Sequence, residues 1–201
     1  MADTKIKFCG LRREEDVKFA ASLGAGFMGF ILSDRFKRFI APEEVGRLKA
    51  FASSAKTVGV FVDEPMDYVV STAKTAKLDY VQLHGSEDEV YIAEIKEKTG
   101  LPVIKMIKPV SENDIITARQ SIADLILLDS GAGGTGKKFD WSLAENLGRD
   151  YILAGGLNPG NVGDAVRRLK PYAVDVSSGV EESGRKDFEK MKAFAAEVRK
   201  T

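Results

Sequence analysis

Eight short apolar segments, rich in β-branched and aromatic residues, recur along the chain. They span residues 6–10, 27–32, 57–62, 78–83, 102–107, 124–129, 151–156 and 173–178. Apolar runs of this length, bounded by glycine, proline and polar residues, are typical of strands buried on both faces of a parallel sheet. The pattern therefore predicts eight parallel strands.

Segments with helical periodicity lie between these strands, among them residues 14–23, 42–52, 66–76, 87–100 and 187–200. Pro42 and Pro159 indicate first helical turns, and Gly100 indicates a helix end just before Pro102 opens the next strand. Each strand is thus expected to be followed by a crossover helix. Eight units share 201 residues, or roughly 25 residues each, so some helices are expected to be short or distorted.

This alternation predicts an α/β fold in which the whole chain, residues 1–201, forms a single (β/α)8 TIM barrel domain. A doubly wound open sheet usually has fewer strands and a glycine-rich turn after the first one, whereas "CGLRREED" follows the first strand here. In a (β/α)8 barrel the active site lies at the carboxyl ends of the strands. A phosphate site is commonly built there by the loops after the seventh and eighth strands.

Composition narrows the classes of function. The 30 basic and 30 acidic residues leave no net charge, which argues against a nucleic-acid partner. No apolar stretch approaches the roughly 20 residues that cross a bilayer, and the first residues lack a signal peptide pattern, so we expect a cytoplasmic protein without a membrane partner. Cys9 is the sole cysteine and His84 the sole histidine, so neither a disulfide nor a Cys/His metal cluster is expected.

Residues that could act in catalysis or ligand binding, or that are small enough to expose the backbone, follow several of the predicted strands. They are Cys9, Arg38, His84, Asp129, Gly155, Gly156 and residues 177–179. In "AGGLNPGN" (154–161) and "DVSSGVEESG" (175–184), small residues precede predicted helical turns. Bare backbone N–H groups at such positions suit a phosphate, although glycine-rich turns often have no ligand. Two of them at adjacent strand ends favour a phosphate site.

Each side chain also has an ordinary interpretation. Cys9 could be a small buried apolar residue rather than a nucleophile or base. Asp129 could brace the glycine-rich loop that follows it. His84 could orient a loop or contact a ligand, and Arg38 could belong to a solvated basic loop.

Lys7 lies two residues before Cys9, about 6 to 7 Å away along a strand, so both side chains should point to the same face. Lys7 could favour the thiolate form of Cys9. Alternatively, it pairs with an inward carboxylate such as Asp175, because a buried ammonium group needs a partner.

Six segments taken together resemble one family. "KFCGLRREEDV", "VGVFVDEP", "VQLHGSE", "LLDSGAGGTGKKFDW", "ILAGGLNPGNV" and "AVDVSSGVEESGRKD" are similar, in this order, to the phosphoribosylanthranilate isomerases of tryptophan biosynthesis. The resemblance covers nearly the whole chain. It implies a (β/α)8 barrel without a cofactor that isomerises a small phosphoribosyl substrate in an Amadori rearrangement.

The resemblance also implies the roles of individual residues. It places the catalytic cysteine at Cys9, the catalytic aspartate at Asp129 and the arginine that binds the anthranilate carboxylate at Arg38. The family usually has Ser-Pro before this arginine, whereas Phe36 and Lys37 stand here, which puts the shape of the loop in question. The other expected substrate-binding residues are His84, Gly133, Gly134, Gly155, Gly156, Asp175, Ser178 and Gly179.

The family's chemistry explains why a carboxylate stands before a glycine-rich loop. A protonated Asp129 would act as general acid on the furanose ring oxygen, and the Cys9 thiolate would remove the C2′ proton from the resulting Schiff base. The loop from Gly131 to Gly136 would then cover the site.

Two rival functions compete with this interpretation. Another phosphosugar barrel is one: a metal-dependent epimerase needs several His and Asp ligands, and an indole-forming synthase needs a lysine where Asp129 stands. A catalytically silent phosphate-binding barrel is the other, and the presence of both Cys9 and Asp129 argues against it. The oligomeric state, monomer or homodimer, is left open.

Overall fold

The computed structural model describes residues 4–130, 140–145 and 147–201. Eight strands, hydrogen-bonded to one another in chain order, close into a barrel, which confirms the predicted fold. The strands are β1 (Lys5–Cys9), β2 (Phe27–Ile31), β3 (Lys56–Phe61), β4 (Tyr80–Leu83), β5 (Val103–Ile107), β6 (Leu125–Leu128), β7 (Tyr151–Leu153) and β8 (Ala173–Val176). Each begins within two residues of its expected start.

Two compact units make up the chain. The first unit comprises Met1–Lys7, Ile107–Ser121 and Ile126–Thr201, and the second unit comprises Phe8–Met106 and Ile122–Leu125. The assignment of all 201 residues to one domain stays a prediction.

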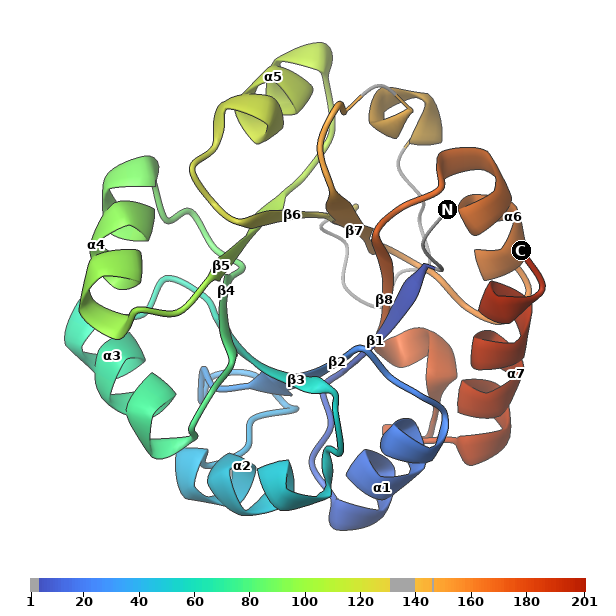
Figure 1. The fold of residues 1–201 in the computed structure, drawn as a ribbon, viewed down its shortest axis with the longest axis horizontal. Helices are drawn as coiled ribbons and strands as arrows, with labels where there is room; N and C mark the ends of the chain where they lie inside the picture. The colour runs from blue at the N-terminus through green and yellow to red at the C-terminus, as the bar shows by residue number, and fades with distance from the viewer. Residues whose placement is uncertain (1–3, 131–139, 146) are drawn as a thin grey trace. The chain divides into compact units, whose positions relative to one another are not determined.

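The helices of the second unit are α1 (Glu14–Ser22), α2 (Pro42–Leu48) with the 3-10 helix η1 (Lys49–Phe51), α3 (Met66–Thr75) and α4 (Glu89–Thr99). Pro42 stands at the start of α2, as predicted. The Asp88 side chain caps α4 by accepting a hydrogen bond from the Tyr91 N–H, and Gly100 ends it at φ +66°. Figure 1 shows α3 and α4 side by side, where they pack against each other.

Strand register decides which side chains of the second unit share a face. Val60 of β3 pairs with Gln82 of β4, and Gln82 pairs with Ile104 of β5. Paired residues of parallel strands point the same way, and successive residues alternate. His84, two residues after Gln82, therefore shares the face of Gln82, whereas Lys105, next to Ile104, points to the opposite face.

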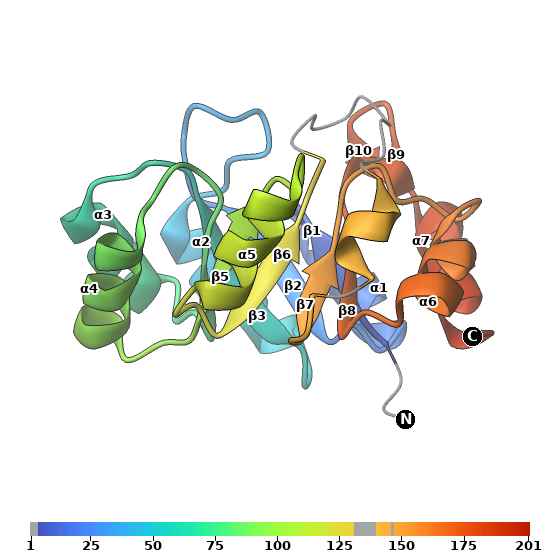
Figure 2. The same ribbon diagram turned by 90° about the horizontal axis from the view of Figure 1, so that it is seen from above.

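The first unit holds α5 (Glu112–Gln120), α6 (Val162–Leu169) and α7 (Phe188–Arg199). A capping box formed by Ser111 and Asp114 begins α5. In Figure 2, α6 lies beside α7, and the two helices are in contact. Among the strands, Leu127 pairs with Ile152, and Ile152 pairs with Ala173.

The predicted start of helix α6 at Pro159 is wrong. Pro159 does not open it, because the helix begins three residues later, at Val162. Residues 158–161 instead form a turn, in which the Asn158 N–H donates to Asn161 Oδ1 and the Asn161 amide donates to the Gly156 carbonyl. Side-chain hydrogen bonds of this kind compete with the first helical turn.

Two connections also depart from the simple strand-helix alternation. Between β6 and β7, the described residues form only the 3-10 helix η2 (Trp141–Ala144). After β8, the 3-10 helix η3 (Ser178–Val180) leads into a two-stranded antiparallel sheet, β9 (Glu181–Glu182) and β10 (Arg185–Lys186). Ser183 and Gly184 join these strands with positive φ at both positions, as tight hairpins prefer.

Candidate active site

Cys9 is the last residue of β1, in the second unit, and is 6% exposed. The chain turns directly after it. Gly10 has φ +75°, and the N–H groups of Gly10 and Leu11 both donate to the Gly29 carbonyl at 2.9 and 3.1 Å. A residue at φ +75° is best a glycine, so the "CG" pair fixes the thiol at the strand end.

Arg38 lies half-buried in the loop between β2 and α2. A bridge between Ile31 and Phe39 ties this loop to the end of β2, and the Ile40 N–H donates to the Ile31 carbonyl at 3.0 Å. Phe36 is 41% exposed. The segment that departs from the family pattern thus forms an ordered turn with an aromatic ring on its outer side.

His84 follows β4 directly and is half-buried. Its backbone N–H donates to the Phe61 carbonyl at 2.8 Å, and its Nδ1 lies 2.8 Å from Nε2 of Gln82. Gln82 is 1% exposed. The ring of His84 is therefore held by a buried amide on its own strand.

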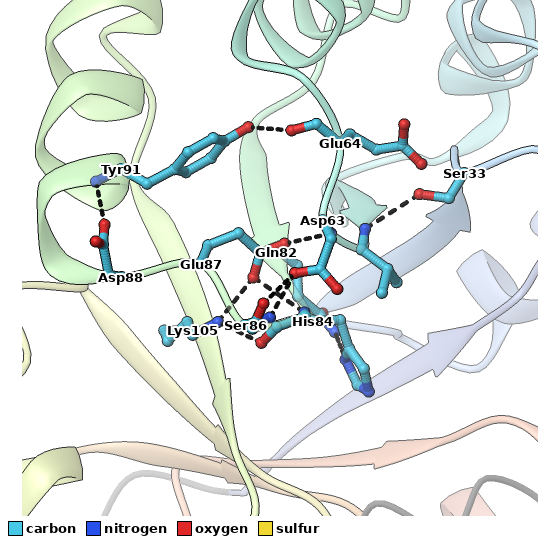
Figure 3. Close-up of polar contacts among 12 residues, drawn as sticks. Ser33, Asp63, Glu64, Gln82, His84, Ser86, Glu87, Asp88, Tyr91 and Lys105 are labelled. Atoms are coloured by element: carbon cyan, nitrogen blue, oxygen red, sulfur yellow. Dashed lines mark hydrogen bonds and ion pairs between the residues drawn. The ribbon is translucent and has the colours of Figure 1, made fainter.

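The loop after His84 is tied to its neighbours by a polar network (Figure 3). Glu87 accepts hydrogen bonds from the N–H groups of Asp63 and Gly85 at 2.8 and 3.0 Å, and forms a 2.7 Å ion pair with Lys105. The same ammonium group donates to the Gly85 carbonyl at 2.7 Å. Since Glu87 and Lys105 are nearly buried, this network rigidly connects the loops after β3 and β4 to strand β5.

Asp63 completes this network with its own side chain. Its carboxylate accepts hydrogen bonds from the Ser86 N–H at 2.6 Å and the Ser86 hydroxyl at 2.8 Å. These hydrogen bonds hold the pKa of Asp63 below its ordinary value near 3.8, with a further contribution from the charges of Arg35 and Lys105.

Asp129 is the first residue after β6, in the first unit, and is half-buried. Its N–H donates to the Ile107 carbonyl at 3.2 Å, and the Ser130 hydroxyl lies 3.5 Å from its Oδ1. Asp129 stands two residues after Leu127, and Asp175 stands two residues after Ala173. Register through Ile152 therefore puts both carboxylates on the same face of the sheet.

Asp175 forms an ion pair with Lys7. Lys7 Nζ lies 2.8 Å from Asp175 Oδ1, and the Lys7 side chain is completely buried. Of the two alternatives for Lys7, the pairing with Asp175 is thus confirmed. Asp175 neutralises the buried ammonium group of Lys7. The ion pair therefore explains why a lysine is tolerated at this buried position, without any interaction between Lys7 and the Cys9 thiol.

The glycine turns after β7 and β8 lie against one another. A Cβ atom at Gly179 would overlap the carbonyl oxygen of Leu157, so only a glycine permits this approach. Gly155 has φ +89°, and a Cβ there would come within 2.7 Å of the Ser130 backbone nitrogen. Three neighbouring strand ends of the first unit, β6, β7 and β8, are therefore joined by backbone contacts at positions without side chains.

Within the described residues, the N–H groups of Gly155 and Gly156 donate no hydrogen bond. Ser178 and Gly179 open η3, where the first backbone N–H groups have no partner inside the helix. The four positions predicted for a phosphate thus gather on two touching turns. Gly133 and Gly134, also predicted to bind substrate, lie outside the described residues.

The chain also matches one family of known proteins over most of its length. The family model described as N-(5'-phosphoribosyl)anthranilate (PRA) isomerase matches residues 6–197. The chain belongs to this family. N-(5'-phosphoribosyl)anthranilate isomerase from Caldanaerobacter subterraneus subsp. tengcongensis is 42% identical over 97% of this chain and 98% of its own length.

Solved structures agree with the family assignment. The phosphoribosyl anthranilate isomerase of Thermus thermophilus has a TM-score of 0.89 and 36% identity, covering 98% of this chain and 99% of that one. A second isomerase, in complex with reduced 1-(o-carboxyphenylamino)-1-deoxyribulose 5-phosphate, has a TM-score of 0.86 and 35% identity, covering 98% and 100% of the two chains.

Among the described residues, no group of three or more His, Cys, Asp or Glu side chains could hold a metal ion. No helix in the described part of the chain is long and apolar enough to cross a membrane.

Gln82, Glu87 and Lys105 were not among the residues predicted from the sequence to matter for the site. Gln82 and Lys105 were visible as polar residues inside predicted buried strands, which requires a partner for each of them. The partners themselves depend on strand register and could not be read from spacing.

We expect Lys7→Met to lower the free energy of unfolding by about 3–5 kcal/mol, because it leaves the Asp175 carboxylate buried without its cation. Adding Asp175→Asn should restore most of this loss. Urea denaturation monitored by circular dichroism measures both. Lys5→Met, on the exposed start of the same strand, is the matched control, and equal losses in the two single variants would contradict a large cost of leaving Asp175 without its cation.

The lowered pKa of Asp63 gives its carboxylate a stabilising effect that is complete above the ordinary value near 3.8 and is lost as the pH falls through the lowered value. Because the Asp63 side chain is exposed and water screens its charge, Asp63→Asn should cost only about 0.5–1 kcal/mol at neutral pH. Asparagine tolerates the positive φ of 48° at this position. Denaturation midpoints of both proteins should converge towards acidic pH; a constant difference would refute this linkage.

Proposed function

We propose that this chain converts N-(5'-phosphoribosyl)anthranilate to 1-(2-carboxyphenylamino)-1-deoxyribulose 5-phosphate, the Amadori rearrangement of tryptophan biosynthesis. Membership of the isomerase family over nearly the whole chain carries this proposal. The presence of Cys9 and Asp129, each at the carboxyl end of its strand, supports it, because (β/α)8 enzymes carry their catalytic groups there.

In the proposed reaction, Asp129 acts as the general acid. Its carboxylic proton passes to the furanose ring oxygen as the bond between that oxygen and C1′ breaks, and the nitrogen lone pair forms the protonated Schiff base. The Schiff base withdraws electrons from C2′ and makes the proton on this carbon removable. Ring opening therefore has to precede the second step.

Cys9 acts as the base in this second step. Its thiolate takes the C2′ proton, the C2′–H electrons form the C1′–C2′ double bond of an enol, and the nitrogen recovers its lone pair. Loss of the enol proton and protonation of C1′ then give the ketone product. No oxidant, reductant or cofactor enters this balance.

The remaining site residues hold the substrate in this proposal. The turns with Gly155, Gly156, Ser178 and Gly179 donate backbone hydrogen bonds to the phosphate. Arg38 binds the anthranilate carboxylate through its forked guanidinium group, and Asp175, fixed by Lys7, faces the sugar. Gly133 and Gly134 are proposed to contact the substrate from the loop after Asp129. The partner is thus a small molecule; the cytoplasmic location and the monomeric or dimeric state stay predictions.

Cys9→Ser and Asp129→Asn should each lower kcat by a factor of about 10² or more, which is the usual size of a general acid or base contribution. The loss of substrate fluorescence on isomerisation measures the rate. Both variants should still bind the reduced product analogue, since their shapes are nearly unchanged. Near-normal turnover of a folded Cys9→Ser variant would mean that the thiol only packs in the core. Absence of isomerase activity in the wild-type protein would reject the proposed function.

Arg38→Ala should raise KM by about tenfold or more and change kcat less, because the carboxylate is bound equally before and during the reaction. Lys37→Ala, on the neighbouring exposed residue, is the matched control and should leave KM within about twofold. Steady-state kinetics on both variants provides the comparison. A larger rise in KM for Lys37→Ala than for Arg38→Ala would mean that Lys37, not Arg38, binds the anthranilate carboxylate.

A further inference from the structure

Gln82 is a polar side chain in an apolar environment. It is 1% exposed, and its register partners on the same face are Val60 and Ile104. Burying an amide is unfavourable unless its hydrogen-bonding groups are satisfied. An apolar side chain at this position would serve packing better, so the amide requires another explanation.

One half of this amide has a partner and the other half has none. Nε2 lies 2.8 Å from His84 Nδ1, as Figure 3 shows for these neighbouring side chains. Oε1 is buried and has no hydrogen-bond partner among the described residues. Gln82 is thus only partly satisfied, a state that buried residues kept for stability alone rarely show.

The contact with Nδ1 links the tautomer of the His84 ring to the orientation of the Gln82 amide. An amide nitrogen can only donate, so Nδ1 accepts and the neutral ring carries its proton on Nε2. If the amide were turned over, Oε1 would accept from Nδ1–H, and Nε2 of a neutral ring would become an acceptor. The orientation of Gln82 and the tautomer of His84 therefore fix each other.

The backbone of His84 is already held by other groups. Its N–H donates to Phe61, and Glu87 anchors the next residue through the Gly85 N–H. These contacts place the Cα atom of His84 but leave the rotation of its ring undetermined. Gln82 supplies a hydrogen bond to the ring itself.

We propose that Gln82 is a positioning residue that holds His84 as the Nε2–H tautomer, so that this N–H donates a hydrogen bond to an oxygen of the bound substrate. The proposal rests on the proposed function and names how His84 takes part in it. Phosphoribosylanthranilate offers carboxylate, hydroxyl and phosphate oxygens as acceptors. A ring locked in this tautomer donates at Nε2 and does not remove protons there, which leaves the C2′ proton to Cys9.

The tautomer can be read directly, because His84 is the only histidine of the chain. In protein labelled with ¹⁵N at histidine, the two ring nitrogens give separate signals whose shifts distinguish protonated from unprotonated nitrogen. At a pH where the ring is neutral, we expect the Nε2–H form to predominate in the wild type. A predominant Nδ1–H form would overturn the proposal, and this readout does not depend on isomerase activity.

Two substitutions separate positioning from packing. Gln82→Met fills nearly the same volume without hydrogen bonds, so the melting temperature should be unchanged or higher while the tautomers become mixed. Gln82→Glu presents a carboxylate that can only accept and should drive the ring to Nδ1–H. Gln120→Met, on an exposed position of α5, controls for the chemical change and should leave the His84 signals unmoved.

Kinetics then test whether Gln82 acts through His84. Gln82→Met should raise KM about fivefold to tenfold, the worth of roughly one hydrogen bond, with a smaller change in kcat. In the His84→Ala background, the same substitution should have no further effect on KM. Additive effects of the two substitutions would overturn the proposal. Wild-type protein that shows the expected tautomer but no turnover would instead reject the proposed function.

Discussion

Parallel pairing of the strands is the constraint on which the candidate site depends. Because paired residues face the same way, the pairing of Leu127, Ile152 and Ala173 puts Asp129 and Asp175 on one face of the first unit. In the second unit, the pairing of Val60, Gln82 and Ile104 does the same for His84. A shift of one residue in either register would turn these side chains away.

The strand ends provide polar groups in two ways, through bare backbone at glycine positions and through buried ion pairs between side chains. Where the chain has to come close, at Gly155 and Gly179, side chains are absent and the backbone provides the polar groups. Where charge is buried, it is paired: Lys7 with Asp175 in the first unit, and Lys105 with Glu87 in the second. Such pairs add little net stability, but they fix the position of a carboxylate or a loop that a ligand can use.

The sequence predicts the strands well because buried parallel strands are continuous apolar runs. All eight were found, and helix ends with local signals, such as Pro42 and Gly100, were placed correctly. Local signals fail where side chains compete with the helix. Pro159 indicated a helix start, but the hydrogen bonds of Asn161 delay the helix to Val162. Catalytic roles came from the family resemblance, whereas the partners of Lys7, Gln82 and Lys105 depend on register and became visible only in the structure.

We propose that one substrate is held by the bare turns of Gly155 and Gly179 while Cys9 and Asp129 act on its sugar. A crystal structure of this chain with reduced 1-(o-carboxyphenylamino)-1-deoxyribulose 5-phosphate tests it most directly. The phosphate should accept hydrogen bonds from the N–H groups of Gly155, Gly156, Ser178 and Gly179, with the Cys9 thiol near C2′ and the Asp129 carboxylate near the oxygen that closes the ring in the substrate. A ligand whose phosphate lies away from these turns, or whose sugar contacts neither side chain, would contradict the account.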